Sequence, residues 1–218
     1  KGEERPYHVP DDFENLGCAS QLVTSLQVHA SNPASTMQEF IDNAKASGKE
    51  ITWGTSGAAT MHATIGHIFF DTHGIKHKKV PFSGGSTARA ALVSQSVEAV
   101  FGGVNTVVGF ENDIRALASA GADRDPMAPD LPTFGEQGTD GIDFTGLMCL
   151  FGATGLPDEV KQDVGAAVEH VSNIDGFKRF MKGNDLAAFY TDAAKATAAQ
   201  NTMFKVMGPV VAEIIKNQ

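Results

Sequence analysis

Two glycine- and hydroxyl-rich turns hold the residues of this sequence that could bind a ligand. The first turn, residues 54–57, follows a short β-prone run and precedes a helical pattern that starts at Ala58. The second turn, residues 83–87, lies between a predicted strand at 79–82 and a predicted helix at 88–97. A turn of this kind leaves backbone N–H groups unpaired at the start of a helix, where the helix dipole also favours negative charge. Each turn is therefore a candidate site for a carboxylate or a phosphate.

The strand–turn–helix unit occurs twice in close succession, which favours one ligand site over two unrelated turns. Turns that follow parallel strands meet at the carboxyl edge of a sheet, where α/β proteins bind ligands. The alternative is that both are ordinary connections that use glycine for its positive φ angle. Neither turn contains Lys or Arg, which predicts recognition by dipoles and water instead of a salt bridge. The predicted ligand-binding residues are Ser56, Gly57, Ala58, Thr60, Gly84, Gly85, Ser86 and Thr87, with Asn105 and Thr106 after a third strand.

The composition is that of a globular protein with a substantial buried core. Hydrophobic residues make up 42% of the 218 residues, which is enough for one large domain or two small ones. The net charge of −9 argues against nucleic acid as a partner. No apolar run approaches the roughly 20 residues of a membrane span, and no signal peptide is recognisable. No cofactor is predicted.

The order of predicted elements indicates an α/β fold. Alternation of strands and helices through residue 151 predicts mainly parallel pairing. A helix is expected over 36–46 with Ser35 as its cap. From 155 to 218 the pattern is helical, and its aromatic and methionine residues, such as Phe180 and Met181, are expected in the core. The other predicted strands cover residues 16–28, 99–101, 114–119 and 144–151.

A serine hydrolase is the alternative function that the first turn raises. Ser56 lies between a strand and a helix, as the nucleophile of an α/β-hydrolase does. The G-x-S-x-G motif needs glycine at position 58, however, and Ala58 breaks it. A triad would further need Asp140 or Asp143 together with His170, which lies on a predicted tail helix with no sign that it reaches the turn. A binding protein is therefore favoured over an enzyme, with no catalytic residue predicted.

Histidines gather after the first turn, at positions 62, 67, 73 and 77, with Asp71 among them. Their spacing is not H-E-x-x-H, and residues 62 and 67 lie too far round a helix to share one face. Packed or solvated histidines are favoured over metal ligands, so no metal site is predicted. His62, in the first helical turn, is a further candidate to line the ligand site.

Several motifs, taken in order, resemble those of one known family. WGTSG at 53–57 is similar to its Y-G-S-S-G turn, and VPFSGG at 80–85 to its V-P-Y-K-G-G. RALA at 115–118 and PDLPT at 129–133 match R-A-L-A and P-D-V-P-T. LFGATGLP at 150–157 is similar to L-F-A-P-A-G-T-P. Over nearly its whole length, the sequence resembles the extracytoplasmic solute-binding proteins of tripartite tricarboxylate transporters, the TctC or Bug family.

This resemblance implies an α/β type II periplasmic binding protein fold, with two lobes joined by crossover strands and a ligand cleft between them. One lobe would combine residues 1–25 and 146–218, and the other would span 26–145. The implied function is that of a periplasmic receptor that captures a small organic acid and delivers it to membrane permease subunits. A ligand-sensing receptor without transport is the alternative within the same fold.

The sequence also departs from the family pattern. Nothing corresponds to the family's N-terminal βα unit with its glycine-rich ligand loop, so the first lobe is expected to be incomplete. The family's aromatic pair at the second crossover is replaced by Gly146 and Leu147, and its histidine after the first turn falls one position away, at His62. The resemblance places Cys18 and Cys149 on or beside adjacent crossover strands. A disulfide and two buried free thiols both remain open.

Overall fold

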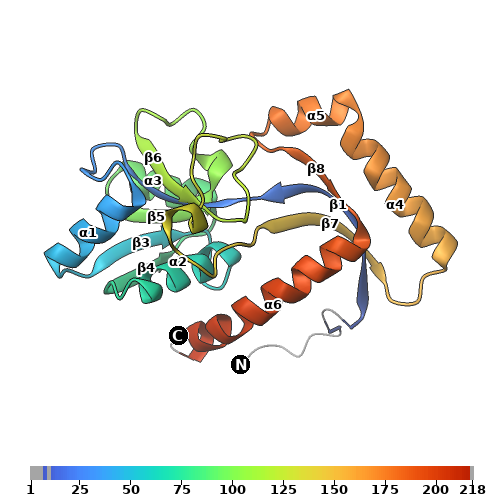
Figure 1. Cartoon of the computed structure of the whole chain (residues 1–218), viewed down its shortest axis with the longest axis horizontal. Helices are drawn as coiled ribbons and strands as arrows, with labels where there is room; N and C mark the ends of the chain where they lie inside the picture. The colour runs from blue at the N-terminus through green and yellow to red at the C-terminus, as the bar shows by residue number, and fades with distance from the viewer. Residues whose placement is uncertain (1–6, 9–10, 217–218) are drawn as a thin grey trace. The chain divides into compact units, whose positions relative to one another are not determined.

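A computed structural model describes residues 7–8 and 11–216 of the chain. The chain divides into two compact units (Figure 1). Unit 1 combines Lys1–Gln21 with Leu147–Thr202, and unit 2 combines Leu22–Gly146 with Met203–Gln218. The lobe boundaries implied by the resemblance stay a prediction. No helix of the described residues is long and apolar enough to cross a membrane.

Unit 2 is built on a five-stranded mixed sheet. Its strand order is β4 (His77–Pro81), β3 (Ile51–Thr55), β5 (Ala99–Gly103), β2 (Thr24–His29) and β6 (Ile114–Ser119). β3 pairs in parallel with β4 and β5, whereas β2 pairs antiparallel with β5 and β6. The predicted mainly parallel pairing is therefore wrong for half of the sheet. Strand–helix alternation predicts parallel pairing only for strands joined by a helical crossover, and β2 inserts between β5 and β6 instead.

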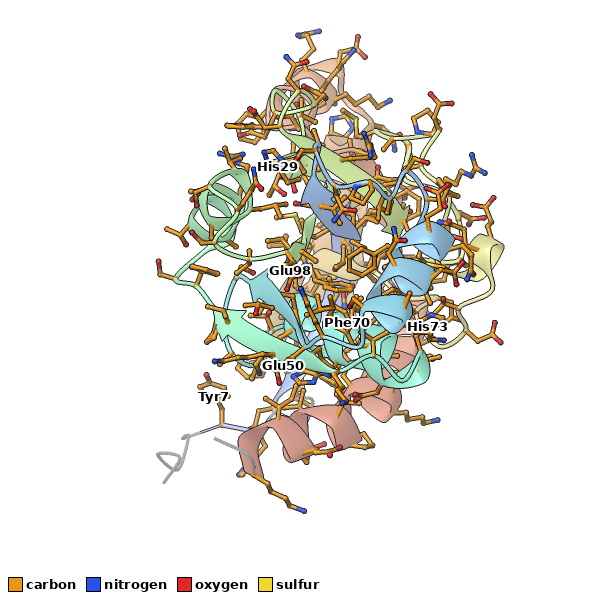
Figure 2. The ribbon with its side chains drawn as sticks, turned by 90° about the vertical axis from the view of Figure 1, so that its left-hand side faces the viewer. Tyr7, His29, Glu50, Phe70, His73 and Glu98 are labelled. Carbon is orange, nitrogen blue, oxygen red and sulfur yellow. A yellow bond between two sulfur atoms is a disulfide. The ribbon has the colours of Figure 1, made fainter. Side chains whose placement is uncertain are left out.

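Helices cover both faces of this sheet. α1 (Met37–Ser47) and α2 (Met61–Thr72) pack on one face, where Phe40, Phe70 and Trp53 share a core. Phe70 is labelled in Figure 2. α3 (Gly85–Val93) packs on the other face through Leu92. Gly66 allows α2 to approach closely, because a Cβ atom there would lie 2.5 Å from the Trp53 ring. The α2–sheet contact therefore depends on a glycine opposite a tryptophan.

The cap of α1 differs from the prediction by one residue. Thr36 is the N-cap, and its hydroxyl accepts a hydrogen bond from the Glu39 N–H at 3.2 Å. Ser35 instead donates its own N–H and hydroxyl to the Glu39 carboxylate, each at 2.7 Å. The prediction of Ser35 as the cap was wrong because Glu39 reaches back past the cap and binds the preceding serine.

Unit 1 contains a three-stranded sheet in the order β7 (Gly146–Ala153), β1 (Phe13–Leu22) and β8 (Ala188–Thr191). The single predicted strand at 16–28 is in fact two, β1 and β2, because the chain changes sheets at Val23, whose carbonyl accepts from the Val104 N–H at 2.8 Å.

The predicted helical tail holds α4 (Asp158–Asn173), α5 (Asp175–Lys182) and α6 (Ala193–Lys216). β8 was missed, since its four residues gain strand character only by pairing with β1. Of the expected core residues, Met181 is buried but Phe180 is 64% exposed.

A disulfide joins Cys18 on β1 to Cys149 on β7. The sequence left a disulfide and two free thiols open, and the structure has the disulfide. The two cysteines are separated by 131 positions in the sequence. Because this loop is long, the bond restricts the unfolded chain strongly.

Removing the disulfide should therefore lower the free energy of unfolding. Chain entropy for a loop of this length gives a loss of about 5 kcal/mol, while measured losses are more typically about 2–4 kcal/mol. We expect a loss in the latter range for the double variant Cys18→Ser/Cys149→Ser, measured by urea unfolding. Thiol titration of the denatured, unreduced wild-type protein is the control, and two reactive thiols there would contradict the structure.

Candidate functional site

Both predicted turns lie at the same edge of the unit 2 sheet. β3 and β4 are parallel neighbours, with Thr55 paired to Pro81 at their carboxyl ends. Beyond this pair, the Phe82 N–H donates to the Thr55 carbonyl at 2.8 Å, which holds the starts of the two turns together. β5 runs parallel to β3, so the segment after β5, the short helix η1 (Val104–Thr106), reaches the same edge. The three segments that carry the predicted site residues thus share one sheet edge.

The first turn is longer than the sequence predicted. α2 begins at Met61 with Thr60 as N-cap, and not at Ala58. Gly57 has a φ of 141°, a conformation that favours glycine, and a Cβ there would lie 2.8 Å from the Thr60 methyl group. Thr60 Oγ1 accepts a hydrogen bond from the Ala63 N–H at 3.2 Å. The hydroxyl proton of Thr60 remains available to a ligand because capping uses only a lone pair of the oxygen.

Backbone donors at the turns are open. Within the part of the chain that the structure describes, no backbone hydrogen bond is donated by the N–H groups of Gly57, Ala58 or Ser86. The first two residues are half-buried and Ser86 is exposed. Unpaired N–H groups at helix starts are the donors that a carboxylate needs.

The second turn is shorter than predicted, since α3 begins at Gly85 with Gly84 as N-cap, and not at Ala88. The Thr87 hydroxyl donates to the Gly84 carbonyl at 2.9 Å and accepts from the Gly84 N–H at 3.2 Å. Thr87 was predicted to bind the ligand, but in the structure its hydroxyl caps its own helix. The Ser83 hydroxyl lies 3.4 Å from that of Thr87. Among the described residues, Ser86 is therefore the hydroxyl of this turn that remains for a ligand.

The segment after β5 meets the second turn. A Cβ atom on Gly85 would lie 3.6 Å from the Thr106 methyl group. The Thr106 hydroxyl donates to the Gly103 carbonyl at 2.7 Å and accepts from Gln27 Nε2 at 3.0 Å. Asn105 lies over Gly103, where its carboxamide oxygen would overlap a Cβ atom. Gln27 was missed, although a fully buried amide between Leu26 and Val28 on a core strand is itself a signal of a polar role.

Two cations reach this edge from outside the turns. Lys79 on β4 donates from Nζ to the Ala58 carbonyl at 2.6 Å, and burial lowers the pKa of its amine. Arg89 on α3 donates to the Thr106 carbonyl at 3.3 Å and lies 3.9 Å from the centroid of the Phe110 ring. Both residues lie outside the two predicted turns, so they were missed. Their positive charge adds to the helix dipoles at the edge.

His62 is held in the interior and does not present its imidazole as an open ligand donor. Its Nδ1 lies 2.7 Å from the Thr24 hydroxyl, and the side chain is buried. Burial lowers the pKa of His62 from 6.5 to about 4, because the charged imidazolium loses its hydration. At neutral pH the ring is therefore uncharged and ties α2 to β2.

Ser56 lacks the surroundings of a nucleophile. Among the hydrogen bonds of residues 7–8 and 11–216, none joins Ser56 to a histidine or a carboxylate. A serine nucleophile needs a base within hydrogen-bond reach. No such base contacts Ser56 among the described residues.

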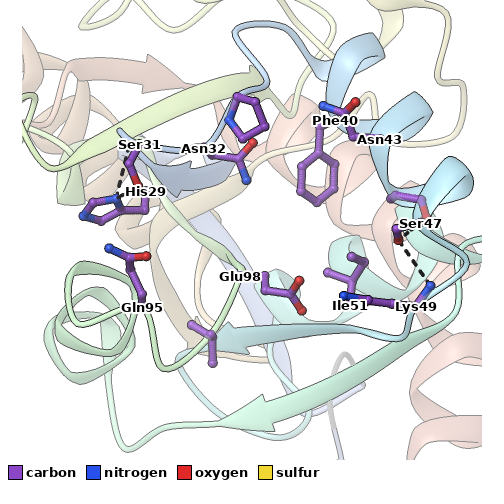
Figure 3. A pocket seen from close by; sticks show the side chains of 13 residues that line it. His29, Ser31, Asn32, Phe40, Asn43, Ser47, Lys49, Ile51, Gln95 and Glu98 are labelled. Carbon is purple, nitrogen blue, oxygen red and sulfur yellow. Dashed lines mark hydrogen bonds between the residues drawn. The ribbon is translucent and has the colours of Figure 1, made fainter.

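A separate cavity of about 420 Å³ lies at the opposite, amino-terminal edge of the strands (Figure 3). Ile51 at the start of β3 and Glu98 just before β5 line it. The Glu98 carboxylate accepts from the Thr52 N–H at 2.9 Å, and the His29 imidazole is bonded to Ser31. These polar groups already have partners, and no predicted site residue lines the cavity. The candidate site is therefore the sheet edge formed by residues 56–60, 83–87 and 105–106, which we call the turn edge.

The His62 environment predicts a loss of stability in acid. Because its pKa is near 4 in the folded protein and near 6.5 when unfolded, the unfolded state takes up the proton first. This stabilisation is complete above about pH 6.5 and is lost as the pH falls toward 4, by at most roughly 3 kcal/mol. Urea unfolding between pH 7.5 and 4.5 should show a smaller acid-induced loss in His62→Gln than in wild type. The variant His170→Gln, at an exposed position, should keep the wild-type profile; identical profiles for wild type and His62→Gln would contradict the assignment.

Comparison with solved structures identifies the fold. A TctC solute-binding protein from Polaromonas has a TM-score of 0.79 at 19% identity, covering 95% of this chain and 70% of that chain. A Rhodopseudomonas palustris protein with adipate has a TM-score of 0.77 at 19% identity, covering 94% and 72%. MatC from Rhodopseudomonas palustris with bound malate has a TM-score of 0.69 at 20% identity, covering 98% and 71%. The chain thus has the two-lobed α/β fold of the TctC and Bug periplasmic binding proteins, as the sequence predicted.

Sequence comparison agrees. The chain is 26% identical over 170 residues to the UPF0065 protein in the gbd 5' region of Cupriavidus necator. This match covers 77% of the chain but only 51% of that relative, so the chain spans about half of the relative's length. The model of the tripartite tricarboxylate transporter family receptor, TctC, matches residues 3–215. Since that match covers almost every residue, the chain belongs to the TctC receptor family.

Proposed function

We propose that this protein is an extracytoplasmic solute-binding protein that captures a small organic acid at the turn edge of unit 2. The observation that carries the proposal is the convergence of three donor-rich segments at one sheet edge. Residues 56–60, 83–87 and 105–106 contain no Asp or Glu, and the N–H groups of Gly57, Ala58 and Ser86 are open in the described structure. Such a surface complements a carboxylate.

Binding of the acid would use donors from both helix starts. One carboxylate would accept from the backbone N–H groups of Gly57 and Ala58 and from the Thr60 hydroxyl. Ser86 and Asn105 would offer further polar contacts from the neighbouring segments. Lys79 and Arg89 already bond to backbone carbonyls and would contribute positive potential without a direct salt bridge.

The family supports the nature of the ligand. Structures with the same fold hold adipate in one case and malate in another, and both molecules are carboxylates. We further propose that the receptor works in the periplasm and passes its ligand to the permease subunits of a tripartite transporter. The role is binding and delivery, without catalysis.

A charge placed at the second turn should disrupt acid binding. Ser86→Asp puts a carboxylate at the start of α3, at the same sheet edge as the turn that would hold the ligand's carboxylate, and the two like charges repel. We expect at least a tenfold rise in the Kd for the bound acid, measured by isothermal titration calorimetry. The fold should persist because an acid near a helix start is favourable. Ser86→Asn introduces a side chain of the same size as Asp but without its charge. The Kd of this variant should stay within about threefold of the wild-type value. Equal affinity in all three proteins would place the site elsewhere.

The charge of the ligand gives a second test. Small mono-, di- and tricarboxylates should raise the melting temperature of the full-length protein, because a ligand that binds only the native state stabilises it. The matching amides should have little effect. An amide loses the charge-assisted hydrogen bonds and turns an acceptor into a donor that faces other donors, a mismatch of about 1–3 kcal/mol. A shift with a neutral sugar, and none across a broad acid panel, would reject the carboxylate proposal.

A further inference from the structure

A cluster of two imidazoles and a carboxylate lies on the α2 face of the unit 2 sheet. His67 and Asp71 are one turn apart on α2, and His77 begins the neighbouring strand β4. Each of the three offers a ligand atom within 4.8 Å of the other two. His77 Nε2 and Asp71 Oδ1 are already 3.1 Å apart. These histidines were predicted to be packed or solvated, since spacing along one helix does not show that β4 brings His77 beside α2.

The surroundings of the cluster are those of an accessible site. The three side chains open into a cavity of about 600 Å³ that is also lined by Lys79 and by Glu213 on α6. Asp71 is 68% exposed, so its carboxylate can rotate toward both imidazoles. His67 Nε2 is buried and has no hydrogen-bond partner among the described residues. A buried ring nitrogen without a partner is unusual and calls for an explanation.

We propose that His67, Asp71 and His77 bind a divalent transition-metal ion, with Zn²⁺ as the best match. Two imidazole nitrogens and one carboxylate oxygen are a donor set that Zn²⁺ accepts, with bonds of about 2.0–2.2 Å. A tetrahedral ion leaves a fourth position, which Glu213 or water fills from the cavity. An ion bound to His67 Nε2 would give that nitrogen the partner that it lacks among the described residues. This inference is independent of the acid-binding proposal.

The hydrogen bonds of His77 define what metal binding must change. The Trp53 indole N–H donates to His77 Nδ1 at 3.0 Å, and an indole can only donate. In the metal-free protein the proton of neutral His77 is therefore on Nε2, facing Asp71. A metal ion at Nε2 moves this proton to Nδ1, which breaks the bond from Trp53. Binding is thus coupled to the environment of the tryptophan.

The charged side chains that line the cavity favour the binding of a cation. Asp71 and Glu213 are carboxylates, while Lys79 carries the opposing charge. The Lys79 amine is held at the Ala58 carbonyl, 2.6 Å away. Two anionic groups against one committed cation leave the site attractive to a divalent ion.

Trp53, the single tryptophan of the sequence, makes the proposal testable. Its ring centroid lies 5.5 Å from that of His67 and 6.0 Å from that of His77. Titration of the metal-free, full-length protein with Co²⁺ in a buffer without carboxylates should quench Trp53 fluorescence at a stoichiometry of one. The same titration should produce the visible absorption of a four-coordinate ion. Zn²⁺ should displace Co²⁺ and abolish that absorption.

Variants assign the site. Asp71→Asn and His67→Gln should each raise the Kd for Zn²⁺ at least tenfold in calorimetry, with far-UV circular dichroism showing that the fold is kept. His170→Gln, on α4 in unit 1, is the matched control for adventitious binding by a surface histidine and should match wild type. No binding by wild type would overturn the proposal. Equal affinity in wild type, Asp71→Asn and His67→Gln would overturn it as well.

Discussion

The contact between Trp53 and Gly66 is the constraint on which the arrangement of unit 2 depends. The tryptophan is fully buried on the central strand β3, and α2 can lie against it only because residue 66 has no side chain. This contact fixes the height of α2 above the sheet. It therefore fixes where the first turn must end at Thr60 and how closely His67 can approach His77. Interiors are packed to crystal-like density, so a larger residue at position 66 would displace the whole helix.

The turn edge shows how a binding surface can be built from backbone groups. The hydroxyls of Thr87 and Thr106 are bonded to main-chain groups in their own segments, so they hold the loops in shape. The groups left for a ligand are mainly N–H donors, which are fixed in direction by the helices that follow them. Donors that are already oriented lose little entropy on binding. A surface of this kind recognises the carboxylate group and leaves the rest of the ligand to be selected by other residues.

Local sequence patterns were sufficient to locate the two turns and the strands β3, β4 and β5, and to identify the family motifs. Gly57 marks the first turn because its φ of 141° favours glycine and a Cβ atom there would crowd the Thr60 methyl group. Contacts between distant segments were not predictable in the same way. Lys79 reaches Ala58 only because β3 and β4 pair in a particular register, and no local signal contains that register. β8 escaped prediction for the same reason, since four residues with little pattern become a strand through a partner far away in the sequence.

The disulfide between Cys18 and Cys149 has a consequence for proteolysis. The residues between the two cysteines include every strand and helix start of the turn edge. A single cut anywhere in that stretch produces two fragments that are still joined covalently through the sulfur atoms. The nicked chain keeps its ends tethered, so the two parts of the sheet can reassociate as if in one molecule. An exposed loop such as residues 108–113 can thus be cleaved without releasing any part of the binding surface from the rest of the protein.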